Sequence, residues 1–192
     1  MINMEFSDVL KKRASVRKYS SKKPETDLAI AAIEAAHIAP SPGNIEILKY
    51  LVVEDKEKII EIAAAAQQPF IEQASLLVVV TSDIKQVQKM YDKRAEKYVR
   101  QHAGAAIENF LLAITDMGLV SCWIGAFNDF EVHDILHIPE NITVEAILPV
   151  AYEHKTNHVS QRKKMQLDRK VYFEEYGNVY KLRTSQVRRT DI

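Results

Sequence analysis

Residues 75–81 read SLLVVVT, and the core of this stretch, Leu76 to Val80, is the most strongly apolar run in the 192-residue chain. A continuous apolar run of this length predicts a strand that is buried on both faces, at the centre of a sheet. It is far shorter than the roughly 18 residues that a membrane-spanning helix needs. The first residues, MINMEFSDVLKKR, lack the apolar core of a secretory signal. We therefore expect a soluble, cytoplasmic protein.

Helical and strand patterns flank this central strand on both sides. Together they predict an α+β fold with four or five strands, in a single domain that spans residues 1–192 and has residues 171–192 as an aromatic-rich C-terminal arm. The pattern predicts helices at residues 5–13, 25–39, 56–66, 84–100, 103–119 and 131–137, and further strands at 48–53, 119–124 and 144–152.

Two of the expected helices, at residues 25–39 and 103–119, are apolar around most of their circumference. A small monomer supplies too few neighbours to bury such helices on every side. Small residues at positions 103–106 would also let another helix approach closely. We therefore expect a homodimer with a helical interface.

The charges balance overall, with 26 basic and 26 acidic residues, but they are unevenly distributed. Residues 1–23 carry seven Lys or Arg against two acids, and residues 154–192 carry ten against four. The two basic ends could meet at one anionic ligand, or they could be ordinary solvated surface. Nucleic-acid binding through RKK at 162–164 and RR at 188–189 is disfavoured, because the net charge is zero and no known module is present.

The remaining motifs give little support to nucleotide-binding loops, metal sites or a catalytic cysteine. The five glycines form neither a dinucleotide-binding fingerprint nor a P-loop. His133 and His137 have the spacing of two metal ligands on one helix face, but no third ligand is evident, and His154 and His158 lie in an expected loop. The single cysteine, Cys122, excludes an internal disulfide and lies in an apolar run, where a thiol is usually a small buried side chain. We expect no metal site and no catalytic cysteine.

Residues 13–20 read RASVRKYS and follow the first expected helix. In an extended chain Arg13, Ser15 and Arg17 share one face, because alternate side chains point the same way. An ordinary exposed edge could have this pattern too. Four further segments follow in order, however: APSPGN at 39–44, QQPFIEQASLLVVV at 67–80, AAIENFLLA at 105–113 and GLVSCWIGAF at 118–127.

This ordered set resembles the FMN-dependent nitroreductase family over residues 6 to about 176. The resemblance assigns the basic positions to the cofactor's phosphate. Arg13 and Ser15 match positions that hold the phosphate and ribityl chain, and Arg17 matches a basic residue near the N1/O2 edge of the flavin. Arg162, helped by Lys163, matches the C-terminal basic position that closes on the phosphate. Arginine suits this task, because its planar guanidinium can bind a phosphate through two hydrogen bonds.

Further matches concern the flavin ring. Gln68 matches a side chain that hydrogen-bonds the N3/O4 edge. Ile124, Gly125 and Ala126 match the segment whose backbone lies against the ring and its N5 atom. A glycine suits such a segment, because it lets a ligand come close to the backbone.

A third set of matches lies in the proline-rich turn. Ser41, Pro42 and Asn44 match residues that, in the family, reach the flavin from the partner subunit. Two positions differ from the common pattern. Glu46 stands where the family commonly has Gln, which removes a donor and adds a negative charge, and Lys164 stands where a proline often follows.

The resemblance implies a mixed sheet flanked by helices in an intertwined homodimer, with FMN as cofactor and NADH or NADPH as electron donor. It implies hydride transfer through flavin N5 to a nitroaromatic, a quinone or a similar small acceptor by a ping-pong mechanism, with no catalytic acid, base or nucleophile from the protein. One alternative is an FMN-binding protein without nicotinamide turnover, which stores, senses or fragments the flavin. The other is a nucleic-acid-binding module with basic ends.

Overall fold

The computed structural model describes residues 4–157 and 170–179. Contacts divide the chain into two units, Met1–Asn157 and His158–Ile192. In the second unit, the described residues contain a turn that is closed by an isolated bridge between Tyr172 and Val179. The expected arm at residues 171–192 is therefore described only as far as Val179. No helix in the described ranges is long and apolar enough to cross a membrane.

The first unit contains a three-stranded sheet of β1 (Leu48–Val53), β2 (Leu77–Ser82) and β3 (Thr143–Pro149), in the order β1-β2-β3. Both pairings are antiparallel. Every residue of β2 is buried. The prediction of a central strand with two buried faces is confirmed.

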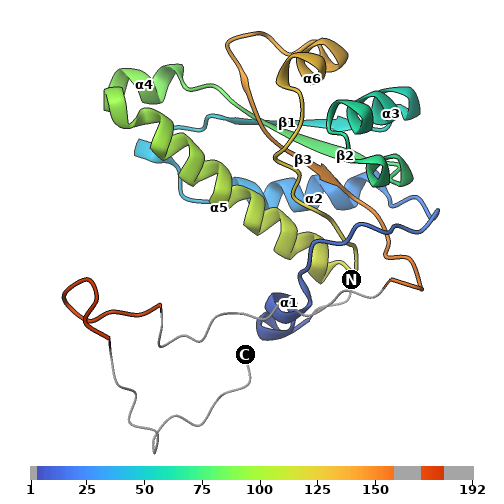
Figure 1. The fold of residues 1–192 in the computed structure, drawn as a ribbon, viewed down its shortest axis with the longest axis horizontal. Coiled ribbons are helices and arrows are strands. Elements are labelled where there is room, and N and C mark those ends of the chain that lie inside the picture. Colours follow the sequence, from blue (N-terminus) through green and yellow to red (C-terminus); the bar gives the residue numbers. More distant parts are fainter. Residues whose placement is uncertain (1–3, 158–169, 180–192) are drawn as a thin grey trace, which may run out of the picture. The chain divides into compact units, whose positions relative to one another are not determined.

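Helices cover both faces of this sheet (Figure 1). These helices are α1 (Phe6–Lys12), α2 (Thr26–His37), α3 (Lys56–Ala65), α4 (Lys85–Tyr91), α5 (Ala95–Asp116) and α6 (Asp129–Leu136). Val78 and Val80 of β2 pack into one cluster with α2 and α5, and Leu77 and Val79 pack into a second cluster with α3 and α6. This arrangement confirms the α+β class.

The expected strand at residues 119–124 is replaced by isolated bridges along the free edge of β3. Val120 pairs with Ala151 and Ile124 pairs with Ile147, both antiparallel and in one register. That register puts Pro149 opposite Cys122, and proline has no N–H to donate to a ladder. The pairing is interrupted there, although the backbone still runs beside β3.

Ser15 forms a parallel bridge with Ser121 on the outer side of this bridged segment. Within residues 4–157 the pairing is therefore mixed, with three regular strands and two further segments that join by isolated bridges. The sequence predicts four or five strands, and two of these are present only as bridged segments.

The helices between β2 and the bridged segment divide at a different point from the one predicted. We expected a break near residue 101, but Asp92 adopts a left-handed φ of 45° and ends α4. The short 3-10 helix η3 (Asp92–Arg94) follows, and α5 then runs for 22 residues. Ala95 and Val99 are buried in the same cluster as the later residues of α5, so they belong to that helix.

The apolar helix α2 is buried on one face only within a single chain. Ala29, Ala32 and Ala36 are fully buried against the core, whereas Ile30 is 43% and Ile38 81% exposed. The expectation that this helix is buried around most of its circumference therefore fails for one chain. Its burial by a second copy remains a prediction.

Candidate functional site

The segment at residues 13–20 is extended and fixed by backbone contacts. Arg13 leaves α1 with φ −56° and ψ 119°. Val16 N–H donates to the carbonyl oxygen of Ser121 at 3.0 Å, and Tyr19 N–H donates to Gln73 Oε1 at 3.1 Å. Val16 and Tyr19 are buried, while Arg17 between them is exposed. The extended conformation predicted from RASVRKYS is present, with Arg17 exposed and Arg13 half-buried.

Arg13 and Ser15 each face a partner from another part of the fold. Nε of Arg13 lies 3.2 Å from Glu108 Oε1, in the second half of α5. Ser15 is bridged to Ser121, so these two side chains lie on the same side of the paired backbones. The ion pair holds Arg13 in place through one nitrogen and leaves the guanidinium's two terminal nitrogens as further donors by its chemistry.

Arg17 connects this segment to the loop after α3. Its guanidinium carbon lies 5.9 Å from the ring centre of Phe70, in the 3-10 helix η2 (Pro69–Gln73). Two residues earlier, Gln68 Nε2 donates to the carbonyl oxygen of Ala126 at 3.4 Å. The contact of Arg17 with Phe70 therefore lies next to the hydrogen bond from Gln68 to Ala126. These residues can contribute to one site.

The backbone at Gly125 and Ala126 is open to a ligand. Ile124 is buried in the core and bridged to Ile147. A Cβ added to Gly125 would meet only Trp123 Nε1 within 4 Å, at 3.8 Å. Gly125 and Ala126 are exposed, so a planar group could approach this backbone closely.

The structure adds Ser121, which the sequence reading missed. Only two buried side-chain polar atoms of the described residues lack a hydrogen-bond partner: Ser121 Oγ and His102 Nδ1. Such atoms are rare in native proteins, where a bound water, ion or other polar group usually satisfies them. Ser121 Oγ lies beside Ser15, at the expected ribityl and phosphate position. This orphan hydroxyl fits a cofactor rich in polar oxygen atoms.

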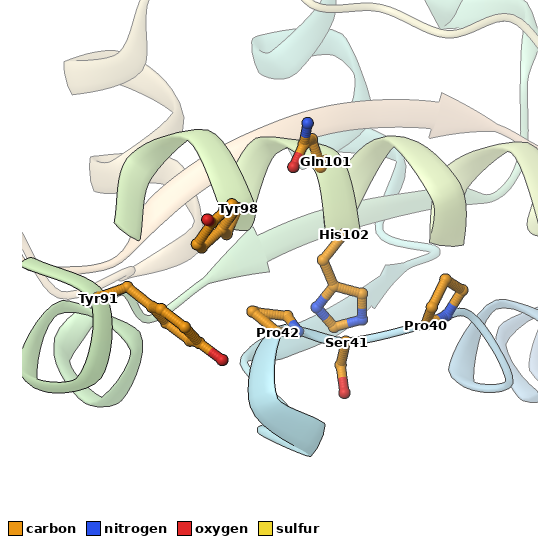
Figure 2. A pocket seen from close by; sticks show the side chains of 7 residues that line it. All are labelled: Pro40, Ser41, Pro42, Tyr91, Tyr98, Gln101 and His102. Atoms are coloured by element: carbon orange, nitrogen blue, oxygen red, sulfur yellow. The ribbon is translucent and has the colours of Figure 1, made fainter. Parts of the chain in front are cut away.

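Ser41, Pro42 and Asn44 lie elsewhere, around the 3-10 helix η1 (Pro42–Asn44). This turn packs against the first half of α5, whereas Arg13 contacts the second half of that helix. The structure therefore does not bring the two groups together within one chain. An open cleft of ≈ 380 Å³ lies beside the turn, and its lining residues are Pro40, Ser41, Pro42, Tyr91, Tyr98, Gln101 and His102 (Figure 2).

Glu46, the position that departs from the family pattern, faces a histidine. Its Oε2 lies 3.6 Å from Nδ1 of His37 at the end of α2. Burial lowers the pKa of His102 below its ordinary value of 6.5, while Glu46 opposes and His37 reinforces that shift. The Glu46 carboxylate therefore lies near two histidines beside the turn, His37 and His102. Arg162 and Lys163 lie outside the described residues.

Comparisons with known proteins agree with this architecture. The model of the nitroreductase family matches residues 10–68 and 61–152. A protein of Archaeoglobus fulgidus with the provisional name NADH dehydrogenase/NAD(P)H nitroreductase is 32% identical over 145 residues, covering 73% of this chain and 80% of its own. These matches define the class of protein as an oxidoreductase of the nitroreductase type, with a helix-covered sheet. The chain belongs to the nitroreductase family, and it is an oxidoreductase.

Two further relatives indicate the range of the family. An iodotyrosine deiodinase of Thermotoga neapolitana is 26% identical over 171 residues, covering 76% of this chain and 87% of its own. The solved structure of an FMN-dependent nitroreductase from Clostridium difficile R20291 is 26% identical and superimposes with a TM-score of 0.73, covering 92% of this chain and 100% of its own. Both aligned regions extend well beyond the sheet, so the similarity includes the helices that cover it.

Proposed function

We propose that this protein binds FMN at the exposed edge formed by residues 13–17 and uses it to pass hydride from NADH or NADPH to a small acceptor such as a nitroaromatic or a quinone. The observation that carries the proposal is the joining of three separate segments at this edge. Ser15 is bridged to Ser121, Arg17 lies against Phe70, and Gln68 donates to Ala126. The names of the relatives, an NAD(P)H nitroreductase and an FMN-dependent nitroreductase, support the choice of cofactor and donor.

Arg13, Ser15 and Ser121 would hold the phosphate and ribityl end. Arg13 is already oriented by Glu108, so it loses little side-chain freedom when a phosphate binds. The hydroxyls of Ser15 and Ser121 can each donate or accept a hydrogen bond, which suits ribityl hydroxyls and phosphate oxygens alike. Arg162 and Lys163 are proposed to complete the phosphate site.

Arg17, Gln68 and the backbone at Gly125 would hold the ring. Arg17 would place a fixed positive charge beside the edge that gains electrons. The amide of Gln68 carries both a donor and an acceptor, as the N3/O4 edge of an isoalloxazine requires. The redox chemistry would come from bound FMN, through hydride transfer at N5. We assign no proton-transferring side chain.

Nicotinamide and acceptor are proposed to use the same open surface at Gly125 and Ala126. Two substrates that share one surface must bind in turn, which predicts ping-pong kinetics. The proposed setting is the cytoplasm, where NADH and NADPH are available. Either nicotinamide, NADH or NADPH, is proposed as the electron donor.

A homodimer is part of this proposal. Phe6 is 68% and Ile38 81% exposed, and both line an open apolar groove between α1, α2 and α5. Exposed apolar patches of this kind commonly mark interaction surfaces. A second copy seated here would cover them, and Ser41, Pro42 and Asn44 would then serve the flavin of the partner. Sedimentation velocity tests this point, with a dimer expected and a monomer at micromolar concentration contradicting it.

The decisive test of the proposed function is an absorption spectrum. We expect a yellow protein, or a colourless one that turns yellow with added FMN, and bleaching of that colour by NADH or NADPH under argon. A protein that stays colourless with FMN would refute the proposal. A yellow protein that neither nicotinamide reduces would favour the flavin-binding alternative. Salt-sensitive retention on DNA without a flavin spectrum would favour the nucleic-acid alternative.

A further inference from the structure

His102 lies beneath the turn that carries Ser41, Pro42 and Asn44. Its ring projects from α5 towards η1 and lies close to Ser41 and Pro42 (Figure 2). The residue is only 3% exposed, and its Nδ1 has no hydrogen-bond partner among the described residues. The imidazole of His102 therefore packs against the turn, and its Nδ1 atom makes no hydrogen bond to it.

The turn itself has little room to move while it stays packed. Gly43 has φ +61°, and a Cβ there would come within 2.8 Å of Met90 Sδ and 2.9 Å of Tyr91 Oη. Two backbone hydrogen bonds close the turn, from Asn44 N–H to Ser41 O at 3.3 Å and from Ile45 N–H to Pro42 O at 3.1 Å. These two amides report on whether the turn is closed.

A neutral imidazole suits this place, and a protonated one does not. Protonated histidine carries N–H donors on both ring nitrogens, and the donor on Nδ1 would be buried without an acceptor. Burying a charge and an unpaired donor costs free energy, which is why burial lowers the pKa of His102. A rearranged turn that admits water would remove both costs.

Several ionisable groups surround the imidazole, and they act in different directions. The carboxylate of Glu46 favours protonation of His102, and a charged His37 opposes it. Tyr50 of β1 remains neutral, since burial and Glu46 raise its pKa to about 12. Tyr91 and Tyr98 line the same cleft as His102, and Arg94 Nη1 donates to Tyr98 Oη. The charged groups nearby on α4, η3 and α5 are Lys89, Asp92, Lys93, Glu96, Lys97 and Arg100.

We propose that His102 is a positioning residue whose neutral imidazole stabilises the closed Ser41–Asn44 turn, so that acidification weakens the turn. The acid sensitivity of the turn is a property of one chain and stands independently of any cofactor. Its consequence for FMN rests on the proposed function, because Ser41 and Asn44 are there assigned to the partner's flavin site.

The direction of the pH dependence follows from proton binding. In the open turn His102 has its ordinary pKa of 6.5, and in the closed turn its pKa is lower. Between these two values the open form binds more protons, so the closed form loses stability as the pH falls below 6.5. Well above pH 6.5 this titration costs the closed turn no stability, and below the lowered pKa the loss levels off.

Hydrogen exchange of the apo protein tests this directly. We expect the protection of the Asn44 and Ile45 amides, corrected for intrinsic exchange, to fall roughly three- to tenfold between pH 7.5 and 5.5, because one proton and an ordinary histidine pKa limit the change to about tenfold. The Val132 amide, which donates to Asn128 O beside His133, should keep its protection. Unchanged protection of the turn amides at pH 5.5 would overturn the proposal.

Three variants separate titration from packing. His102→Gln should abolish the pH dependence of turn protection, and His133→Gln should leave it intact. Glu46→Gln should increase the loss at low pH, because the carboxylate that favours the protonated, closed form is gone. Should His102→Gln fail to fold, the wild-type profile and Glu46→Gln still decide the matter. If the turn amides of Glu46→Gln lose the same protection at low pH as those of wild type, Glu46 does not act on His102, and this contradicts the proposal.

The affinity for FMN tests the proposed link between the turn and the cofactor. The phosphate of FMN itself titrates near pH 6, so affinity falls with acid in every variant. We expect a steeper fall in wild type than in His102→Gln between pH 7.5 and 5.5. If neither protein binds FMN, the proposed function fails while the exchange result still stands. If both bind with equal pH profiles although the turn amides lose protection, the link to the cofactor fails.

Discussion

Two segments that the resemblance assigns to one kind of site are built in different ways. The segment at residues 13–17 is held by directional contacts: an ion pair at Arg13, a bridge at Ser15 and a ring contact at Arg17. The turn Ser41–Asn44 is held by shape, through a left-handed Gly43 pressed against α4 and a buried imidazole beneath it. The first segment supplies charge for a ligand. The second supplies a fixed position, so disturbing it should affect stability before binding.

Replacing both arginines should give the largest effect. In Arg13→Ala/Arg17→Ala we expect the Kd for FMN to rise at least about 100-fold, because charge-assisted hydrogen bonds contribute roughly 1.5–3 kcal/mol each and 1.4 kcal/mol corresponds to tenfold. Flavin fluorescence titration of apo protein measures it. Lys11→Ala/Lys12→Ala, at exposed positions on α1, is the matched control for lost charge and should stay close to wild type. Wild-type occupancy in the double arginine variant would show that this segment does not hold FMN.

Two glycine substitutions should separate the two segments by what each one changes. Gly43→Ala should lower the free energy of unfolding by about 2 kcal/mol and Tm by roughly 4–8 °C, because a Cβ is strained at positive φ and meets Met90 and Tyr91. Gly125→Ala has space for its Cβ and should leave Tm unchanged. Thermal unfolding of both apo proteins checks this contrast. Equal Tm values would contradict the rigid packing of the turn.

The same Gly125→Ala variant should weaken FMN binding by about tenfold, since the added methyl group would keep the ring from the backbone and overpacking costs about 1–3 kcal/mol. The titration used for the arginine variants measures it. Unaltered affinity would show that the ring does not lie against this backbone.

The smallest effect is expected at the ring contact of Arg17. Phe70→Leu removes an aromatic face 5.9 Å from the guanidinium and should raise the Kd for FMN two- to fivefold, since an exposed cation–π contact contributes about 0.5–1 kcal/mol. Phe130→Leu, at an 85% exposed position on α6, serves as the control and should change nothing. An equal change in both variants would exclude a specific role for Phe70.

Much of the fold could be predicted because short patterns decide it. The run SLLVVVT predicted the central strand, since a buried strand needs apolar side chains on both faces. The strand expected around Cys122 failed because Pro149 lies opposite it, and no local pattern shows which residue will be opposite. The helix break at Asp92 was missed for a similar reason. Its neighbours favour a helix, and only the packing of Ala95 and Val99 shows where α5 begins.

The candidate site divides in the same way. The alternation of Arg13, Ser15 and Arg17 predicted an extended segment, because backbone conformation over a few residues is a local property. Ser121 and His102 could not be found from the sequence, because an unpartnered polar atom exists only once distant elements have packed around it. A serine directly before CWIGAF is the only signal for the first, and a histidine on an otherwise apolar helix face is the only one for the second.

The central claim is that residues 13–17 hold the phosphate of a flavin nucleotide. The most direct measurement compares the affinities of wild-type apo protein for FMN and for riboflavin, which has the same ring and ribityl chain but no phosphate. We predict that riboflavin binds at least about 100-fold more weakly, the loss expected from two or more charge-assisted hydrogen bonds. Equal affinities for FMN and riboflavin would contradict the account.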